Sequence, residues 1–250
     1  MEQTIGKIKA DLQALGVKNG DNLLVHSSLR SLGKVEGGAE TVIRGMLEAL
    51  GGEGTLLFPA LSYVAVNAAN PVFDVRNTPS CVGALPEYFR TRPGTVRSLH
   101  PTHSMSGIGK NTAELFGDHW RSTTSCGEFS PFRKLRDLGG WVLFLGCSTH
   151  PNTMMHAVEE LVDDPPYLHT DPVDYRIIRE DGSAITMRVR RHNFKGYRQR
   201  YDRLCALLKD DEIRRGKVLE ADCTLLNIPA IWREGLAALQ KDPFFFVEEC

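Results

Sequence analysis

The sequence predicts a layered α/β fold with a mixed sheet, and three observations lead to this prediction. Helix-like and strand-like patterns alternate through the first half of the chain. Residues 141–146 are continuously apolar between glycines, which is typical of a strand buried on both faces. An Asp181-Gly182 turn between two alternating segments indicates a late β-hairpin. A hairpin beside parallel strands makes the sheet mixed.

The first part of the chain alternates helix and strand. Ile5, Ile8, Leu12 and Leu15 recur at helical spacing, and Gly16 ends that pattern. Short apolar runs before and after a second helical pattern indicate two buried strands. In chain order we expect a helix at 3–15, a strand at 22–26, a helix at 39–50 and a strand at 55–61.

The remaining elements follow from turn chemistry and capping. Residues 62–80 indicate a long loop, which in a compact domain is often functional. Ser130 and Pro131 are typical of a helix cap and first turn. We expect helices at 83–90 and 130–138, a strand at 141–146, hairpin strands at 174–180 and 184–191, and helices at 197–209 and 228–240.

Composition and charge narrow the class of protein. The 250 residues are 42% hydrophobic and 24% charged, which favours one globular domain. The sequence has 30 Lys and Arg and 31 Asp and Glu, and we identify no local basic run. A nucleic-acid binder is therefore not expected. The longest apolar run is far shorter than the roughly 20 residues that span a bilayer, and the first residues lack a signal-peptide core.

The cysteines indicate a reducing compartment. The six are widely spaced, with no CxxC pair, and a chain of this size needs no disulfides for stability. We therefore predict free thiols and a cytoplasmic location. Cys147 ends the central strand and is interpreted as a small buried hydrophobe rather than a nucleophile.

The first candidate site is the polar segment 25–33, directly after a predicted strand. Hydroxyls, backbone amides and Arg30 at the carboxyl end of a strand suit a phosphate-rich ligand. Neither a P-loop nor a GxGxxG motif is present. The alternative is a polar loop that only leads into the next helix.

The second candidate is the loop 97–104, in which His100 and His103 flank Pro101 and Thr102. Two histidines at this spacing on a proline-containing loop are weak indicators of a metal site, because no cysteine cluster accompanies them. Structural histidines that bind backbone atoms are the alternative.

The third candidate is the segment 153–163. At 100° per residue its apolar side chains share one arc, and the opposite arc carries one histidine and three carboxylates. A carboxylate orients an imidazole and makes it a competent general base near neutral pH, and clustered carboxylates attract a cationic substrate. The alternative is a solvated amphipathic helix. The polar arc comprises Thr153, His156, Glu159, Glu160 and Asp163.

Taken together, these segments resemble the aminoglycoside 3-N-acetyltransferase family, the antibiotic N-acetyltransferases that do not have the GNAT fold. Several separate motifs in one order and spacing cover most of residues 20–165 and are far more specific than any one motif. They are VHSSLRSLG (25–33), GALPEYFR (83–90), RSLHPTHSMSGIG (97–109), GEFSPFRKL (127–135), GGWVLFLG (139–146) and TMMHAVE (153–159).

The resemblance implies a single domain over 1–250, three α/β/α layers, and acetyl-CoA as co-substrate without a metal. It implies that Ser27, Ser28, Leu29 and Arg30 contact CoA and that Ser104 lies near the thioester. His156 matches the essential histidine of the family, with Glu159 at the family spacing. Glu87 lies in a matching segment and is a second candidate partner of His156, although by default it is a surface helix residue.

The implied reaction is acetylation of the 3-amino group on the 2-deoxystreptamine ring of an aminoglycoside. His156 would remove the amine proton as the amine attacks the acetyl carbonyl directly, and the Ser104 hydroxyl or backbone amides would bind the oxyanion. Glu160 and Asp163 would line the acceptor pocket. Three alternatives stay open: a different amine acceptor, a non-catalytic binding protein, and a metal-dependent hydrolase that uses His100, His103, His156 and Glu159.

Overall fold

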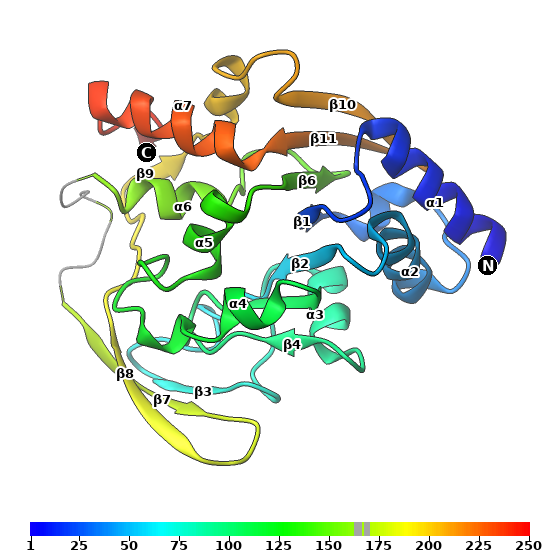
Figure 1. The fold of residues 1–250 in the computed structure, drawn as a ribbon. Helices are drawn as coiled ribbons and strands as arrows, with labels where there is room; N and C mark the ends of the chain where they lie inside the picture. The colour runs from blue at the N-terminus through cyan, green and yellow to red at the C-terminus, as the bar shows by residue number, and fades with distance from the viewer. Residues whose placement is uncertain (163–166, 168–170) are drawn as a thin grey trace.

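A mixed sheet of seven strands forms the centre of the computed structural model (Figure 1). The structure describes residues 1–162, 167 and 171–250. Strand β1 pairs in parallel with β2 and β6, whereas β5 and β11 run antiparallel to their neighbours, so the predicted mixed sheet is confirmed. The spatial order is β10 (Ile213–Val218), β11 (Ala221–Asn227), β6 (Trp141–Leu145), β1 (Asn22–Ser27), β2 (Thr55–Pro59), β5 (Met105–Gly109) and β4 (Val96–Arg97).

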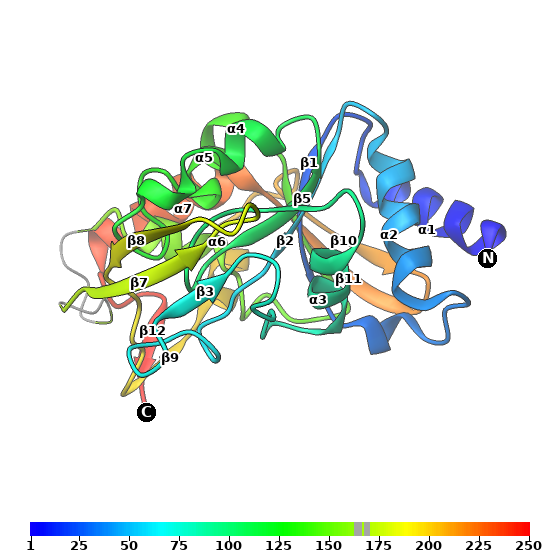
Figure 2. The same cartoon turned by 90° about the horizontal axis from the view of Figure 1, so that it is seen from below.

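Helices cover both faces of the sheet and make three layers. The residues of β6 alternate between the layers: Leu143 and Leu145 pack with the first group of helices, Val142 and Phe144 with the second. Figure 2 shows α1 and α2 on one side and α4 and α5 on the other. The first group is α1 (Glu2–Leu15), α2 (Gly38–Leu50) and α3 (Ala84–Thr91); the second is α4 (Thr112–Phe116), α5 (Pro131–Leu138), α6 (Met154–Glu159) and α7 (Ile228–Lys241).

The late hairpin forms as predicted but lies outside the central sheet. Its strands β7 (Val173–Ile178) and β8 (Ala184–Val189) pair antiparallel, and β7 also pairs in parallel with β3 (Val72–Asp74). Strand β3 interrupts the segment 62–80 that we predicted as loop. The strands enclose a small apolar cluster of their own around Phe73 and Tyr175.

The predicted helix at 197–209 is wrong. Residues Tyr197–Gln199 form β9, which pairs with the C-terminal strand β12 (Val247–Glu249), and a 3-10 helix follows at Tyr201–Ala206. The hairpin of β10 and β11 was also missed. Four of the six residues of β10 are exposed or half-buried, and charged side chains on an edge strand obscure the apolar pattern of a strand.

The local features predicted from capping and cysteine usage are confirmed. Ser130 Oγ accepts a hydrogen bond from the backbone N–H of Arg133 at 3.2 Å, and all six cysteines are free. The remaining short helices are 3-10 turns at Leu29–Leu32 and His119–Arg121. Across the described residues, no helix has both the length and the apolar character needed to cross a membrane.

Candidate active site

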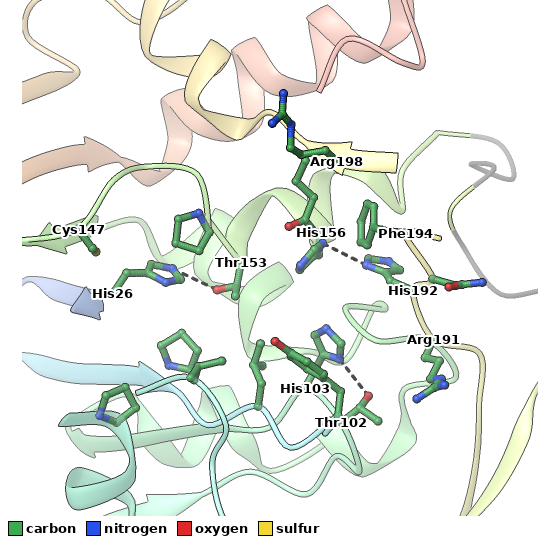
Figure 3. A pocket seen from close by; sticks show the side chains of 18 of the residues that line it. His26, Thr102, His103, Cys147, Thr153, His156, Arg191, His192, Phe194 and Arg198 are labelled. Atoms are coloured by element: carbon green, nitrogen blue, oxygen red, sulfur yellow. Dashed lines mark hydrogen bonds between the residues drawn. The ribbon is translucent and has the colours of Figure 1, made fainter. Parts of the chain in front are cut away.

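A cavity of about 770 Å³ lies at the carboxyl ends of the parallel strands, the edge where open α/β sheets bind ligands. His26 and Ser27 end β1, Pro59 ends β2, and Cys147 follows β6. Figure 3 shows His103, His156 and His192 facing one another across it. The lining also includes Leu61, Tyr63, Val82, Thr102, Thr153, Arg191, Asn193, Phe194, Tyr197, Arg198 and Gln199.

A second, more open cavity of about 690 Å³ adjoins the first at Ser27. Its lining includes Ser27, Ser28, Leu29 and Arg30, which are the four residues that the resemblance assigned to CoA. Ser27 Oγ is buried and has no hydrogen-bond partner among the described residues. An unpartnered hydroxyl at the junction of two cavities fits a ligand that passes from one to the other.

Helix α6 brings His156 and Glu159 together. Both side chains are buried, and His156 Nδ1 lies 3.4 Å from Glu159 Oε2, as the i, i+3 spacing of a helix allows. The hydroxyl of Tyr201 donates to the same carboxylate oxygen at 2.7 Å and lies 3.0 Å from His156 Nδ1. Because every residue of α6 is buried, the alternative of a solvated amphipathic helix is wrong.

Burial favours the uncharged forms of this pair. Burial lowers the pKa of His156 well below its ordinary value, and the neighbouring His192 lowers it further. Burial raises the pKa of Glu159 to about 8, against the opposite effects of His192 and the Tyr201 hydroxyl. His156 is therefore a neutral imidazole at pH 7, able to accept a proton.

His192 connects the site to Glu160. Its Nδ1 lies 3.1 Å from His156 Nδ1, and its Nε2 lies 2.9 Å from Glu160 Oε1. Glu160 also accepts hydrogen bonds from Thr124 Oγ1 at 2.5 Å and from the Cys126 N–H at 2.9 Å. Burial raises the pKa of Glu160, but these partners outweigh it and the net shift is downward, so Glu160 is an internal carboxylate.

The two histidines of the HxxH loop have different roles. His100 Nδ1 accepts the N–H groups of Thr102 and His103, and its Nε2 lies 3.1 Å from the Thr124 carbonyl, so both nitrogens bind backbone. His103 lines the cavity, 5.7 Å from His156 between ring centroids.

Three histidines meet in the cavity. Nitrogen atoms of His103, His156 and His192 lie within 4.8 Å of one another, the one such group found among the described residues. Imidazole nitrogens suit zinc, so this triad, without His100, is the set able to hold a metal.

The wall nearest β1 carries His26, Thr153 and Cys147. The His26 ring stacks on Phe144 at 5.0 Å, and its Nε2 lies 3.3 Å from Thr153 Oγ1. Burial lowers the pKa of His26 to about 3 and raises the pKa of Cys147 to about 11. Cys147 is therefore a thiol at neutral pH, which disfavours a nucleophilic role.

Two predicted site residues lie elsewhere. Ser104 is fully buried outside the cavity lining, where its hydroxyl donates to the Ala60 carbonyl at 2.7 Å and accepts from Arg97 Nε at 2.9 Å. Glu87 binds Arg90 through both carboxylate oxygens and accepts the Ser80 N–H at 2.7 Å. The structure therefore pairs His156 with Glu159 rather than with Glu87.

The predicted role of Glu160 as an acceptor carboxylate is also corrected. Glu160 points to Thr124, Cys126 and His192 rather than lining the cavity. Helical spacing placed it on the polar arc but did not reveal that protein covers that arc. Asp163 lies outside the described residues.

The segment Arg191–Gln199 was missed as a wall of the site. It contributes seven lining residues, among them His192, Phe194 and Arg198. The available signal was charge: residues 188–203 hold seven Lys and Arg and one Asp, so the prediction that the sequence has no local basic run is wrong. Tyr201 was hidden inside the helix wrongly predicted at 197–209.

Comparison with known proteins identifies one family throughout. The model of the aminoglycoside 3-N-acetyltransferase family matches residues 24–240. Aminoglycoside N(3)-acetyltransferase VII of Streptomyces paromomycinus is 34% identical over 177 residues, which cover 64% of this chain and 61% of that protein. The match therefore spans less than two thirds of the length of that curated relative.

Solved structures agree over nearly the whole chain. The structure described as AAC-IIIb binary with CoASH has a TM-score of 0.81 at 26% identity and covers 95% of this chain and 96% of that one. A mutant of AAC(3)-IVa in complex with a gentamicin has a TM-score of 0.80 at 26% identity and covers 96% and 90%.

Proposed function

The chain belongs to the aminoglycoside 3-N-acetyltransferase family, and on that premise we propose that it transfers the acetyl group of acetyl-CoA to an amine. One observation carries the proposal: the buried His156 lines the cavity, and Glu159 and Tyr201 contact it at Nδ1. All described hydrogen-bond partners of the His156 ring contact its Nδ1 atom. This arrangement leaves Nε2 for the substrate.

The donor is proposed to occupy the second cavity and to reach the first at Ser27. Ser28, Leu29 and Arg30 would hold the phosphate-rich part of CoA, with the guanidinium of Arg30 as the charged contact. The unpartnered Ser27 Oγ is available to a polar atom of the ligand where the cavities join. Ser104 is not part of this proposal, because its hydroxyl is engaged by Ala60 and Arg97.

The proposed mechanism is direct transfer with general-base catalysis. An ammonium group has no lone pair, so the acceptor must react as a neutral amine. That amine must also lose a proton as the C–N bond forms. A Glu159 carboxylate would accept the Nδ1–H of His156 and leave Nε2 free to take that proton. The C–S bond then breaks and CoA leaves as the thiolate, which takes up a proton.

The acceptor supported by family membership is the 3-amino group of a 2-deoxystreptamine ring. The comparison structure in complex with a gentamicin supports this choice. A different amine is the second candidate, because the described lining of the cavity carries Arg191 and Arg198 and no carboxylate.

Turnover of the purified protein tests the reaction. We expect calorimetry to detect CoA binding, and acetyl-CoA with a panel of aminoglycosides and simple amines to release free thiol. The His156→Ala variant is the matched control, since it should bind CoA without turnover. Absence of CoA binding, or stoichiometric zinc with hydrolase activity, would instead favour the metal-dependent alternative built on His103, His156 and His192.

A further inference from the structure

The cavity wall opposite β1 is strongly basic. Residues 188–203 run from the end of β8 through β9 into the following 3-10 helix and carry seven Lys and Arg against one Asp. Two of these cations, Arg191 and Arg198, line the cavity that contains His156 (Figure 3).

No carboxylate lines this cavity among the residues that the structure describes. The nearest acidic residues are Glu159, at the end of α6, and Glu160, which follows it. Neither lines the cavity. Glu159 binds Tyr201 and His156, and Glu160 binds Thr124, Cys126 and His192, so both carboxylates already have internal partners.

Two acidic residues outside the cavity pair with three arginines of the basic run. Glu248 of β12 contacts Arg198, Arg200 and Arg203 together, with Arg198 Nε at 2.8 Å. Asp202 binds Arg200 as well. Three guanidinium groups thus share two carboxylates, so these three side chains together keep one excess positive charge.

A polycation entering here would lose hydration without gaining an anionic partner from the described lining. An anionic group also loses hydration, but it gains a guanidinium partner from the lining. A guanidinium presents a planar set of N–H donors that matches a carboxylate or phosphate oxygen pair.

We propose that the acceptor amine carries an acid group, either carboxylate or phosphate-like, that Arg191 and Arg198 bind while the amine lies against His156. This inference rests on the proposed acetyl transfer and develops its second acceptor candidate, an amine other than an aminoglycoside. The amine nitrogen bonds to the acetyl carbon, the carbon–sulfur bond of acetyl-CoA breaks, and the amine proton passes to His156. The products are an N-acetylated acid and CoA thiol.

Matched pairs of acceptors test this inference. The probes are a homologous series of ω-amino acids and ω-aminoalkylphosphonates, each beside its neutral carboxamide or diester, together with gentamicin. We expect the acid-bearing member of a pair to show at least about a 10-fold higher kcat/KM, the effect of one charge-assisted contact. That preference should disappear in Arg191→Gln and weaken in Arg198→Gln.

Lys195→Gln is the matched control variant, because Lys195 belongs to the same basic run, is exposed and does not line the cavity. It removes one positive charge and should leave the preference unchanged. Equal loss in Lys195→Gln would assign the effect to general charge and overturn the assignment to Arg191.

Three further outcomes separate the inference from the proposed function. Efficient acetylation of gentamicin with no preference for acids would overturn the inference and leave the acetyltransferase intact. Weaker CoA binding in Arg191→Gln, measured by calorimetry, with an unchanged acceptor KM would mean that the wall binds the phosphates of CoA instead. No acetylation of any amine would reject the proposed function, and this inference with it.

Discussion

Two adjoining walls of the cavity, helix α6 and the segment 191–199, differ in burial and in charge. Helix α6 is buried from end to end, and its ionisable residues contact one another and Tyr201. The wall formed by 191–199 is partly exposed, and its Arg198 binds Glu248 near the surface. Burial shifts the pKa values of His156 and Glu159 strongly. In the proposed reaction the buried wall would supply the base, and in our inference the basic wall would select the acceptor.

The largest effect should come from the buried wall. His156→Ala is expected to lower kcat by at least about 100-fold, because general-base catalysis is typically worth roughly 10²–10⁴ in rate. His156→Asn, which keeps a polar side chain there, should lose activity equally. Circular dichroism and CoA calorimetry would show whether fold and donor binding persist. Retention of more than about a tenth of the wild-type rate would remove His156 from the base role.

The second effect concerns Glu159, the carboxylate beside the proposed base His156. Glu159→Gln should lower kcat by roughly 10- to 150-fold, the value of a lost charge-assisted contact to the developing imidazolium. In the wild type, kcat at saturating acceptor should rise with pH through about 8, as Glu159 loses its proton and can accept Nδ1–H. The same pH profile in Glu159→Gln would contradict this assignment.

The third effect concerns the second cavity, where we propose that CoA binds. This cavity is separate from the two walls compared above. Combined Ser27→Ala and Arg30→Ala should raise the KM for acetyl-CoA by at least about 10-fold with little change in kcat, because these contacts bind substrate and transition state equally. Lys34→Ala, an exposed neighbour outside the cavity lining, is the control. Unchanged acetyl-CoA affinity in the double variant would exclude this loop from the donor site.

The smallest effect is a difference in melting temperature between variants of Glu159, in the buried wall, and of Glu248, which pairs with Arg198 of the basic wall. The pKa of Glu159 is raised to about 8 in the folded state, so its contribution to stability is present below its unfolded pKa and is lost as pH rises through about 8. The melting temperature of Glu159→Gln should therefore rise relative to that of the wild type as the pH increases from 5 to 8.

Glu248→Gln should stay close to the wild type over the same range. Contacts with Arg198 and Arg200 lower the pKa of Glu248, which places its titration below pH 5, and exposed ion pairs stabilise little. A melting-temperature difference that does not change with pH for Glu159→Gln would show that Glu159 titrates normally and would remove the contrast between the walls.

Much of the fold follows from local patterns in the sequence. The apolar run of β6 is continuous because helices cover both faces of the sheet there. Strand β10 could not be found in the same way, because a charged edge strand has no clear period. Tyr197 was misassigned because its strand depends on pairing with Glu249, a residue near the other end of the chain.

The sequence by itself determined which residues meet within one helix. His156 and Glu159 share a face because the α-helix brings positions i and i+3 together wherever it forms. Only the tertiary structure decided what covers that face. His192 and Tyr201, 36 and 45 residues further on, reach His156 through pairings and turns that no local period records. The same packing buries Glu160 and places Arg191 at the cavity, because long-range contacts depend on how whole elements pack against one another.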